Sequence, residues 1–388
     1  MEEWKEYKLG DVAGVKGGKR LPKGVNLVKE PNTHPYIRVR DLGTKRFLEL
    51  DCTYEYVDDE TQKSIARYIV NTGDIIISIV GTIGLTAIIG ESLNYANLTE
   101  NCVKLINIKG LNRDYLYYYL ISDCGKQEIE RGIVGAVQAK LPIKNIQSIS
   151  IKAPSLETQK RIASILSSLD DKIEVNRKIN ENLEQQAQAL FKSWFVDFEP
   201  FKNGEFVESE LGMIPKGWRV GTLDDLLEIK YGKDHKKLSD GKIPVYGSGG
   251  LMRRVDKSLY KGESVLIPRK GTLNNVMYVN EEFWTVDTMF YTIPKVEHIA
   301  LFCYLFLLGK DLASMNAGSA VPSMTTEILN SMPVVIPQNS IVNEFDNVIS
   351  SYFRKIENND NESRRLASLR DTLLPKLMSG ELKVNEIA

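Results

Sequence analysis

The stretch IASILSSLDDKIEVNRKINENLEQQAQALFKSW spans Ile162–Trp194 and carries a heptad pattern of apolar residues. Steps of four and three residues from Ile162 reach Ile, Leu, Ala and Trp side chains, interrupted by Asn176 and Asn180. Such a stripe predicts a long α-helix that packs against another helix. Pro154 and Pro200 lie on either side of the stretch, where helices commonly begin and end.

The same pattern recurs 183 residues later without a gap, so that Phe345 takes the place of Ile162. Upstream, WKEYKLGDVAGVKGGK (Trp4–Lys19) is similar to WRVGTLDDLLEIKYGK (Trp218–Lys233). The chain is therefore two copies of one design, each a globular segment followed by a long helix.

An asparagine interrupts both stripes at the same place, at Asn176 and Asn359. A buried asparagine in a coiled coil fixes its register and orientation. The two helices can pack antiparallel against each other, or each can form a separate homodimer, and the matched asparagines favour the first arrangement. Pro375 falls where the first helix has Lys192, so the second helix is expected to kink or end earlier.

The globular segments have a mixed character. Ile75–Val80 and Val334–Ile336 are predicted strands, while Tyr115–Ile121 and Ile299–Leu308 are predicted helices. We expect an α+β fold with a pseudo-two-fold internal repeat, in which two globular domains are separated by two long helices packed as an antiparallel coiled coil. The expected division is residues 1–155 for the first domain, 156–199 for the first helix, 200–338 for the second domain, and 339–388 for the second helix and C-terminal segment.

Composition indicates a soluble globular protein, with 43% hydrophobic and 26% charged residues among 388. We expect no membrane contact, because no apolar run approaches the ~20 residues that a bilayer requires. Four widely spaced cysteines predict no disulfide framework, which indicates a cytoplasmic protein. The net charge is only −1, so any nucleic-acid binding must come from local concentrations of positive charge.

Catalytic signatures are missing from the sequence. It contains no GxxxxGK[ST] phosphate-binding loop, no HExxH and no Cys/His metal spacing. We therefore expect no catalytic residues, no metal and no cofactor.

Basic clusters occur at equivalent places in both copies. Residues 12–29 carry five basic and no acidic side chains, and the second copy has lysines around Asp234. Lysines bind phosphates as point charges, while Arg and Asn can make bidentate contacts with base edges. The two arginines that flank Val39 are expected on one face of a strand. The candidate DNA contacts are Lys16, Lys19, Arg20, Lys23, Arg38 and Arg40 in the first copy, and Lys230, Lys233, Lys236, Arg253, Arg254, Arg269, Lys270 and Asn274 in the second.

Aromatic residues gather at the end of the first long helix. Some of these aromatics are expected to cover a globular segment or a docked partner helix, with Trp194 mostly internal. The candidate partner contacts are Phe191, Phe195 and Phe198.

Several stretches of the chain resemble the specificity subunits of type I restriction–modification systems, and the resemblance covers the whole chain. They are LGDVAGVKGGK (Leu9–Lys19), LETQKRIASILSSLDDKI (Leu156–Ile173), ALFKSWFVDFEP (Ala189–Pro200), IPKGW (Ile214–Trp218), GSAVPSMTTEILNSMPVVIP (Gly318–Pro337) and LLPKLMSGEL (Leu373–Leu382). The resemblance implies that each globular part is a target recognition domain for one half of a split site in double-stranded DNA. The helices would act as a spacer on which two methyltransferase subunits dock, and restriction (translocase) subunits are further partners that it allows. Methylation and cleavage would belong to those partners.

Two other functions are compatible with parts of the pattern. A fused restriction–methylation polypeptide would need catalytic motifs that this sequence does not contain. A coiled-coil scaffold whose globular parts bind protein would show no salt-dependent affinity for DNA.

Overall fold

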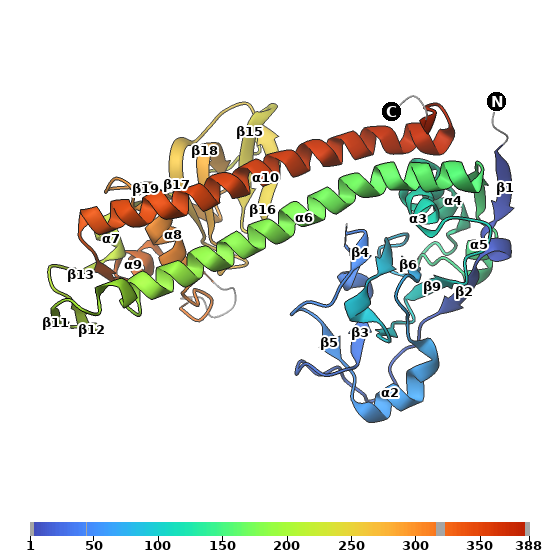
Figure 1. Ribbon diagram of the computed structural model, residues 1–388, viewed down its shortest axis with the longest axis horizontal. Coiled ribbons are helices and arrows are strands. Elements are labelled where there is room, and N and C mark those ends of the chain that lie inside the picture. The colour runs from blue at the N-terminus through green and yellow to red at the C-terminus, as the bar shows by residue number, and fades with distance from the viewer. Residues whose placement is uncertain (1–3, 44, 316–322, 385–388) are drawn as a thin grey trace. The chain divides into compact units, whose positions relative to one another are not determined.

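The computed structural model describes residues 4–43, 45–315 and 323–384. The chain divides into two compact units (Figure 1): unit 1 comprises Met1–Val175 and Asn361–Ala388, and unit 2 comprises Asn176–Asp360. Two long helices, α6 (Leu156–Phe195) and α10 (Asn339–Ser379), each contribute to both units. The part of the second repeat from Gly318 to Pro322 lies outside the described residues.

Unit 1 is a mixed α+β structure. Its strands pair in the orders β2-β9-β6-β7-β4, β5-β3-β8 and β1-β10. The strands are β1 (Lys5–Lys8), β2 (Gly14–Gly17), β3 (Pro35–Ile37), β4 (Phe47–Leu48), β5 (Glu55–Tyr56), β6 (Ile75–Ser78), β7 (Thr86–Ile89), β8 (Asn97–Leu98), β9 (Cys102–Ile106) and β10 (Ser150–Ala153). The shorter helices are α1 (Leu9–Val12), η1 (Val39–Asp41), α2 (Asp59–Ile65), η2 (Ala66–Tyr68), η3 (Glu91–Leu93), α3 (Arg113–Ile121), α4 (Asp123–Gly132) and α5 (Ile143–Gln147).

Unit 2 is built around a larger sheet with the strand order β14-β19-β17-β18-β15-β16, beside the pairs β11-β12 and β13-β20. The strands are β11 (Phe206–Ser209), β12 (Gly212–Pro215), β13 (Arg219–Thr222), β14 (Leu227–Tyr231), β15 (Asp240–Gly247), β16 (Gly250–Val255), β17 (Tyr260–Pro268), β18 (Met277–Thr285), β19 (Met289–Pro294) and β20 (Pro333–Ile336). The shorter helices are η4 (Glu199–Phe201), α7 (Leu223–Leu226), α8 (Ala300–Leu308) and α9 (Thr326–Asn330).

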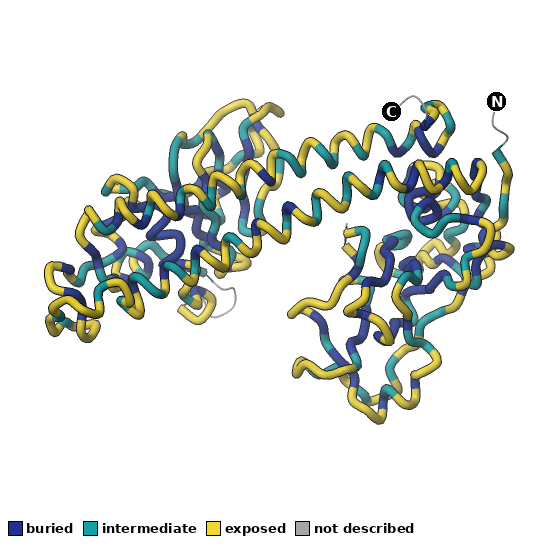
Figure 2. The backbone as a smooth tube through the Cα atoms, viewed as in Figure 1, coloured by how far each residue is buried: buried dark blue, intermediate teal, exposed yellow. Residues whose placement is uncertain are grey.

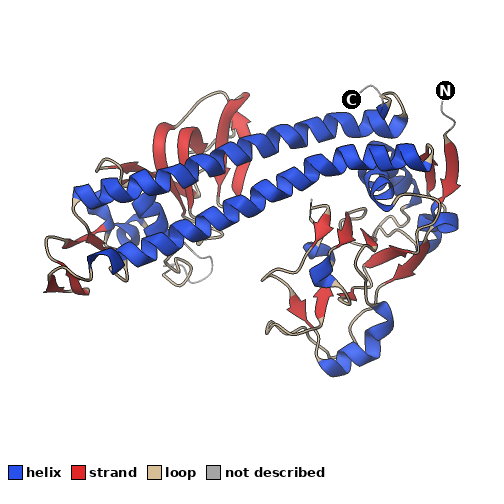
Figure 3. Cartoon of the chain, viewed as in Figure 1, coloured by secondary structure: helices blue, strands red, loops and turns tan. Residues whose placement is uncertain are grey.

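The two units repeat the same element order, which confirms the internal repeat. The segment β1–α1–β2 recurs as β13–α7–β14, and α5–β10 recurs as α9–β20. In each unit the first of these strands pairs antiparallel with the strand that precedes the long helix. The strands expected near Ile75 and Val334 are present as β6 and β20, and the helices expected near Tyr115 and Ile299 are present as α3 and α8. Both units combine helices and strands (Figure 3).

Both long helices complete the hydrophobic core of each unit. In unit 1, Ile162 and Leu166 of α6 and Leu377 of α10 lie in the same buried cluster as the sheet and α3. In unit 2, Phe195 of α6 and Phe345 of α10 take this place beside α8. The burial pattern along α6 and α10 in Figure 2 follows the predicted stripe, because the heptad positions are buried or half-buried.

Within each unit α6 and α10 run antiparallel. In unit 1, Arg370 pairs with Asp170 (Nη1–Oδ1 2.6 Å). In unit 2 a polar layer interrupts the apolar stripe: Asn359 donates to Asn180 at 2.8 Å, and the Asn176 amide faces the Asn359 carbonyl at 3.4 Å. The antiparallel pairing confirms the expected fold class. In the polar layer the Asn359 side chain bonds to the Asn180 side chain, whereas the Asn176 side chain bonds to the Asn359 backbone.

The ends of the long helices differ from expectation at one place. Of the two alternatives at Pro375, a kink or an earlier end, the earlier end is wrong, because α10 continues to Ser379 with the proline inside it. Leu374, Leu377 and Met378 are buried in the unit 1 core, which stabilises the last turn. Within the described ranges, no helix has both the length and the apolar character needed to span a membrane.

Candidate nucleic-acid interface

Three of the candidate arginines in unit 1 meet at one surface pocket. Arg20, Arg38 and Arg40 line a hollow of about 370 Å³ together with Thr99, Glu100 and Asn101. Arg20 comes from the basic loop after β2, and the other two arginines flank the start of η1. The residues of the β8–β9 turn are far away in sequence and uncharged apart from Glu100, so the basic-cluster pattern could not have identified them.

Two carboxylates fix the arginines of this pocket. Glu55 accepts from Arg38 and from Arg40, the latter with Nη2–Oε2 at 3.0 Å. Asp41 lies 3.4 Å from Nε of Arg40 and accepts the backbone N–H of Arg38 at 2.7 Å. The expectation that both arginines lie on one strand face is wrong, because β3 ends at Ile37 and Val39–Asp41 form a 3₁₀ turn. The shared carboxylate brings the guanidinium groups together instead.

The two arginines differ in exposure. The Arg40 side chain is 57% exposed, whereas the Arg38 side chain is 24% exposed. Within the described part of the chain, Nε and Nη2 of Arg38 are buried and make no hydrogen bond. Arg40 is therefore the more accessible of the two guanidinium groups, and Arg38 shares the carboxylate of Glu55 with it.

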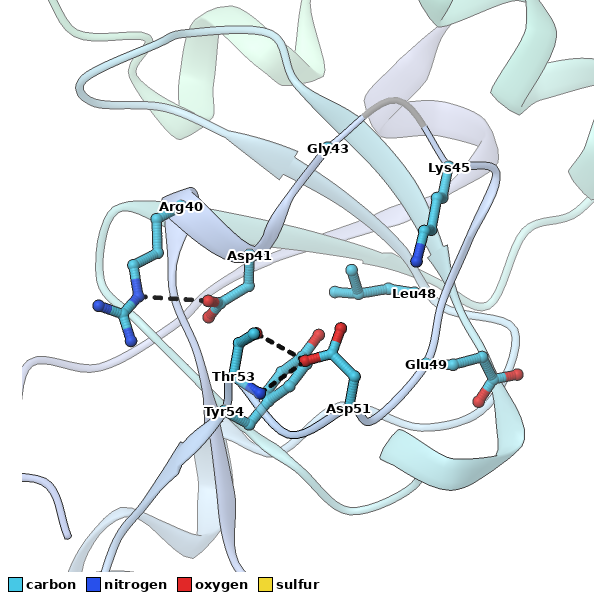
Figure 4. Close-up of a pocket in the computed structure, with 9 residues that line it drawn as sticks. All are labelled: Arg40, Asp41, Gly43, Lys45, Leu48, Glu49, Asp51, Thr53 and Tyr54. Atoms are coloured by element: carbon cyan, nitrogen blue, oxygen red, sulfur yellow. Dashed lines mark hydrogen bonds and ion pairs between the residues drawn. The ribbon is translucent and has the colours of Figure 1, made fainter. Parts of the chain in front are cut away.

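Arg40 also lines a second hollow, of about 440 Å³ (Figure 4). Asp41 and Asp51 line it, and Thr53 donates to Asp51 from both its N–H and its hydroxyl group. Burial raises the pKa of Asp41 to about 6, although Arg40 acts to lower it. Burial also raises the pKa of Tyr54.

The candidate lysines of unit 1 have few internal partners. Lys16 and Lys23 are exposed, and no described carboxylate lies within ion-pair distance of either. Lys19 lies over the ring of Tyr68, with 5.6 Å from Nζ to the centroid. Arg20 differs, because it pairs with Glu100 at 2.7 Å. An exposed cation without an internal partner can bind a phosphate without breaking an ion pair.

In unit 2, too, some candidate cations pair with a carboxylate and others do not. Lys230 pairs with Glu228 at 2.5 Å, and Arg253 pairs with Asp240 at 2.9 Å. Lys233, Lys236 and Lys270 are exposed, and the described residues provide no carboxylate within ion-pair distance of them.

Two further candidates in unit 2 hold their own loops in place. Arg269 lies over the Tyr231 ring at 5.4 Å and donates to the carbonyl of Asp287 at 3.1 Å. Asn274 donates to Asp311 at 3.1 Å and accepts the N–H of Ala313 at 2.8 Å. Both ends of the Asn274 amide thus have partners within unit 2. Arg254 donates to the Lys242 carbonyl at 2.6 Å and remains exposed.

The aromatic cluster at the end of α6 is mostly internal. Phe191 and Phe195 are 5% and 6% exposed and pack on Phe302 and Phe345. They belong to the core of unit 2, so the expectation that they form a partner-binding surface is wrong. Phe198 is half-buried against Trp218, with ring centroids 5.6 Å apart.

Known proteins share this organisation. A model of the type I restriction modification DNA specificity domain matches residues 1–185 and 215–370. The MjaIX specificity subunit of Methanocaldococcus jannaschii is 28% identical over 100% of this chain and 95% of its own length. The HindI specificity subunit of Haemophilus influenzae is 25% identical over 98% of this chain and 100% of its own.

A solved structure supports the fold. The S subunit of a type I restriction–modification system from M. genitalium superposes with a TM-score of 0.56 at 18% identity, covering 97% of this chain and 96% of that one. The family model, which matches most of the chain in two blocks, agrees with the two repeats described above. The chain therefore belongs to the family of type I restriction–modification DNA specificity subunits.

Proposed function

We propose that this specificity subunit reads a bipartite site in double-stranded DNA and has no catalytic activity of its own. The first head (residues 4–155) binds one half of the site, and the second head (residues 200–338) binds the other. One observation carries the proposal: equivalent loops, after β2 in one head and after β14 in the other, present exposed lysines for which the described residues provide no ion-pair partner. The described residues also hold no group of three or more His, Cys, Asp or Glu side chains placed to bind a metal.

The partners in this proposal are two methyltransferase subunits, with restriction subunits as further components. Because Phe191 and Phe195 are buried, docking must use other surfaces. The long helices leave Val175, Ile179, Val348 and Leu369 exposed outside the heptad stripe. Apolar residues on a helix surface are favourable contacts for a partner helix. The proposal places the protein in the cytoplasm, where its DNA and partners are.

Exchange of one head is expected to change one half of the site. The chain is co-expressed with its methyltransferase, and residues 4–155 are replaced by the first head of the MjaIX relative. Sequencing of methylated genomic DNA should then show a bipartite motif in which one half is new and the other is unchanged. The motif should disappear when the chain is deleted. If the motif is still methylated after deletion, this chain does not specify it. If both halves change together, the two heads do not read DNA independently.

Removal of the exposed lysines is expected to weaken binding to any DNA sequence. In the assembled complex, Lys233→Ala with Lys236→Ala should lower specific and non-specific affinity together. The slope of log affinity against log salt should fall by about 0.9 for each phosphate that the variant no longer neutralises. Lys216→Ala is the matched control, because Lys216 is exposed but paired with Glu205 at 2.5 Å.

Arg40→Ala is expected to differ from the lysine variants in its effect on binding. Glu55 fixes the orientation of the Arg40 guanidinium, which suits it to contact one particular base. The substitution should weaken the free energy of binding to specific duplexes by roughly 1–3 kcal/mol and relax the preference at particular bases.

Unchanged salt slopes in the lysine variants would show that the lysine-bearing loops do not contact the DNA.

A further inference from the structure

Unit 2 exposes apolar side chains on two hairpins. On the β15–β16 hairpin Leu251 and Met252 are 52% and 57% exposed, and on the β11–β12 hairpin Leu211 and Met213 are 45% and 55% exposed. Exposed pairs of large apolar residues on a rigid hairpin indicate contact with a ligand or a partner. The two hairpins differ in net charge, so they are expected to bind different kinds of partner.

The tip of the β15–β16 hairpin is tightly built. Gly247 pairs with Gly250 across a two-residue turn, and Gly250 has a φ of 107°, which a residue with a side chain adopts only with strain. Met252 lies across Gly247, so a Cβ at that position would meet the Met252 side chain. The register shifts between Val245 and Tyr246, which leaves Met252 as a bulged residue between the pairs Val245–Arg253 and Tyr246–Leu251. A bulge re-aims side chains from the usual strand alternation, and both Leu251 and Met252 are exposed beside the turn.

Neighbouring elements hold the tip in position. The Asn275 side chain donates to the carbonyl of Ser248 at 2.7 Å, which ties the turn to the loop that carries Arg269 and Lys270. β16 is an edge strand of the large sheet, so its outer side has no neighbouring strand among the described residues. The apolar pair is thus presented on a fixed support beside basic side chains.

The charge around the β15–β16 hairpin is complementary to a nucleic acid. Residues 233–257 carry seven Lys and Arg and three Asp, and Asp240 is already paired with Arg253. Residues 205–216, which form the other hairpin, carry three Glu and one Lys. A polyanion is attracted to the first hairpin and repelled by the second.

We propose that Leu251 and Met252 form an apolar wedge that enters the minor groove and unstacks one base step in the half-site of the second head. Leu and Met are among the side chains that proteins insert between base pairs, with cations on the flanking phosphates. Arg254 and Lys236 provide such cations, because both are exposed and neither pairs with a described carboxylate. The inference rests on the proposed function, since it requires that the second head binds DNA.

The test uses the complex of the full chain with its methyltransferase. Duplexes that carry the methylated motif are made with 2-aminopurine replacing one adenine at a time, in either strand of the second half-site and the base pairs next to it, excluding the methylated adenine, which the methyltransferase itself would flip. Binding of the unaltered chain should raise the fluorescence at one base step. Leu251→Ser with Met252→Ser should abolish this increase and lower specific affinity roughly 10- to 100-fold, while the salt slope stays unchanged because no charge is removed.

Two further variants serve as controls. Leu211→Ser with Met213→Ser removes a similar pair from the acidic hairpin and should leave the fluorescence increase intact. Exchange of the pair, Leu251→Met with Met252→Leu, keeps an apolar tip and should also retain it, which separates the wedge from a general loss of folding.

Three results would overturn the wedge. One is a bound complex without any fluorescence increase, and another is a serine variant that retains the increase. The third is a loss of affinity when thymine is replaced by uracil with no fluorescence change, which would assign the pair to thymine methyl groups instead. A wild-type chain that directs no bipartite methylation would refute the proposed function itself, whereas normal methylation with no unstacking would refute the wedge alone.

Discussion

Phe195→Ser is expected to lower the free energy of unfolding of unit 2 by roughly 3–5 kcal/mol, the range for removal of a buried aromatic ring. The Phe195 ring lies 4.8 Å from that of Phe345 and 4.9 Å from that of Phe302, so its loss leaves a cavity among rings that cannot all move together. A buried serine hydroxyl adds a further cost if it finds no partner.

Urea unfolding followed by tryptophan fluorescence measures this destabilisation, because Trp194, Trp218 and Trp284 all belong to unit 2. Val196→Ser is the control: Val196 is the next residue in the chain but is 56% exposed. It should change the stability by less than about 0.5 kcal/mol. Equal stability of the two variants would contradict the assignment of Phe195 to the core.

Arg46→Ala is expected to destabilise unit 1 by roughly 1–3 kcal/mol, because it removes two charge-assisted hydrogen bonds from a mostly buried guanidinium group. Asp114 keeps Arg113 as a second partner at 3.1 Å, which limits the loss. The Arg46 side chain is 10% exposed; it pairs with Asp114 at 2.6 Å and with Asp171 of α6 at 2.9 Å. Its guanidinium also lies 4.7 Å from the centroid of the Phe47 ring. Arg46 thus connects the sheet of the first head to the long helix.

Hydrogen exchange of unit 1 amides measures the effect, since it resolves unit 1 from unit 2. Arg46→Lys retains the charge but not the planar fork that reaches both carboxylates, so it should restore only part of the stability. Lys45→Ala removes the adjacent, exposed basic residue and should have little effect. If the alanine variants at 45 and 46 behave alike, the two ion pairs contribute little to the stability of unit 1.

The elements that the sequence predicted are those whose pattern is local. The heptad stripe from Ile162 depends on residues three and four apart, and β6 is an uninterrupted β-branched run from Ile75, so both could be identified without knowing the fold. The repeat then predicted the antiparallel pairing, because two equivalent helices expose equivalent stripes.

The details of the candidate interface depend on residues far apart in the sequence. Arg40 meets Glu55, and Arg20 meets Glu100 across 80 positions, so the basic-cluster pattern could not separate paired from unpaired cations. For the same reason the aromatic run near Phe195 was assigned to a partner surface: its apolar character was evident, but the α8 residues that cover it lie about a hundred positions later.

The division of the long helices between the units has a consequence for the order in which the protein can fold during synthesis. Unit 2 is one continuous segment, Asn176–Asp360, whereas unit 1 joins Met1–Val175 to Asn361–Ala388. The core of unit 1 includes Leu377 and Met378, so it cannot close until those residues have left the ribosome. The head translated first is therefore completed last, and its apolar surface must wait for more than two hundred residues of chain to emerge.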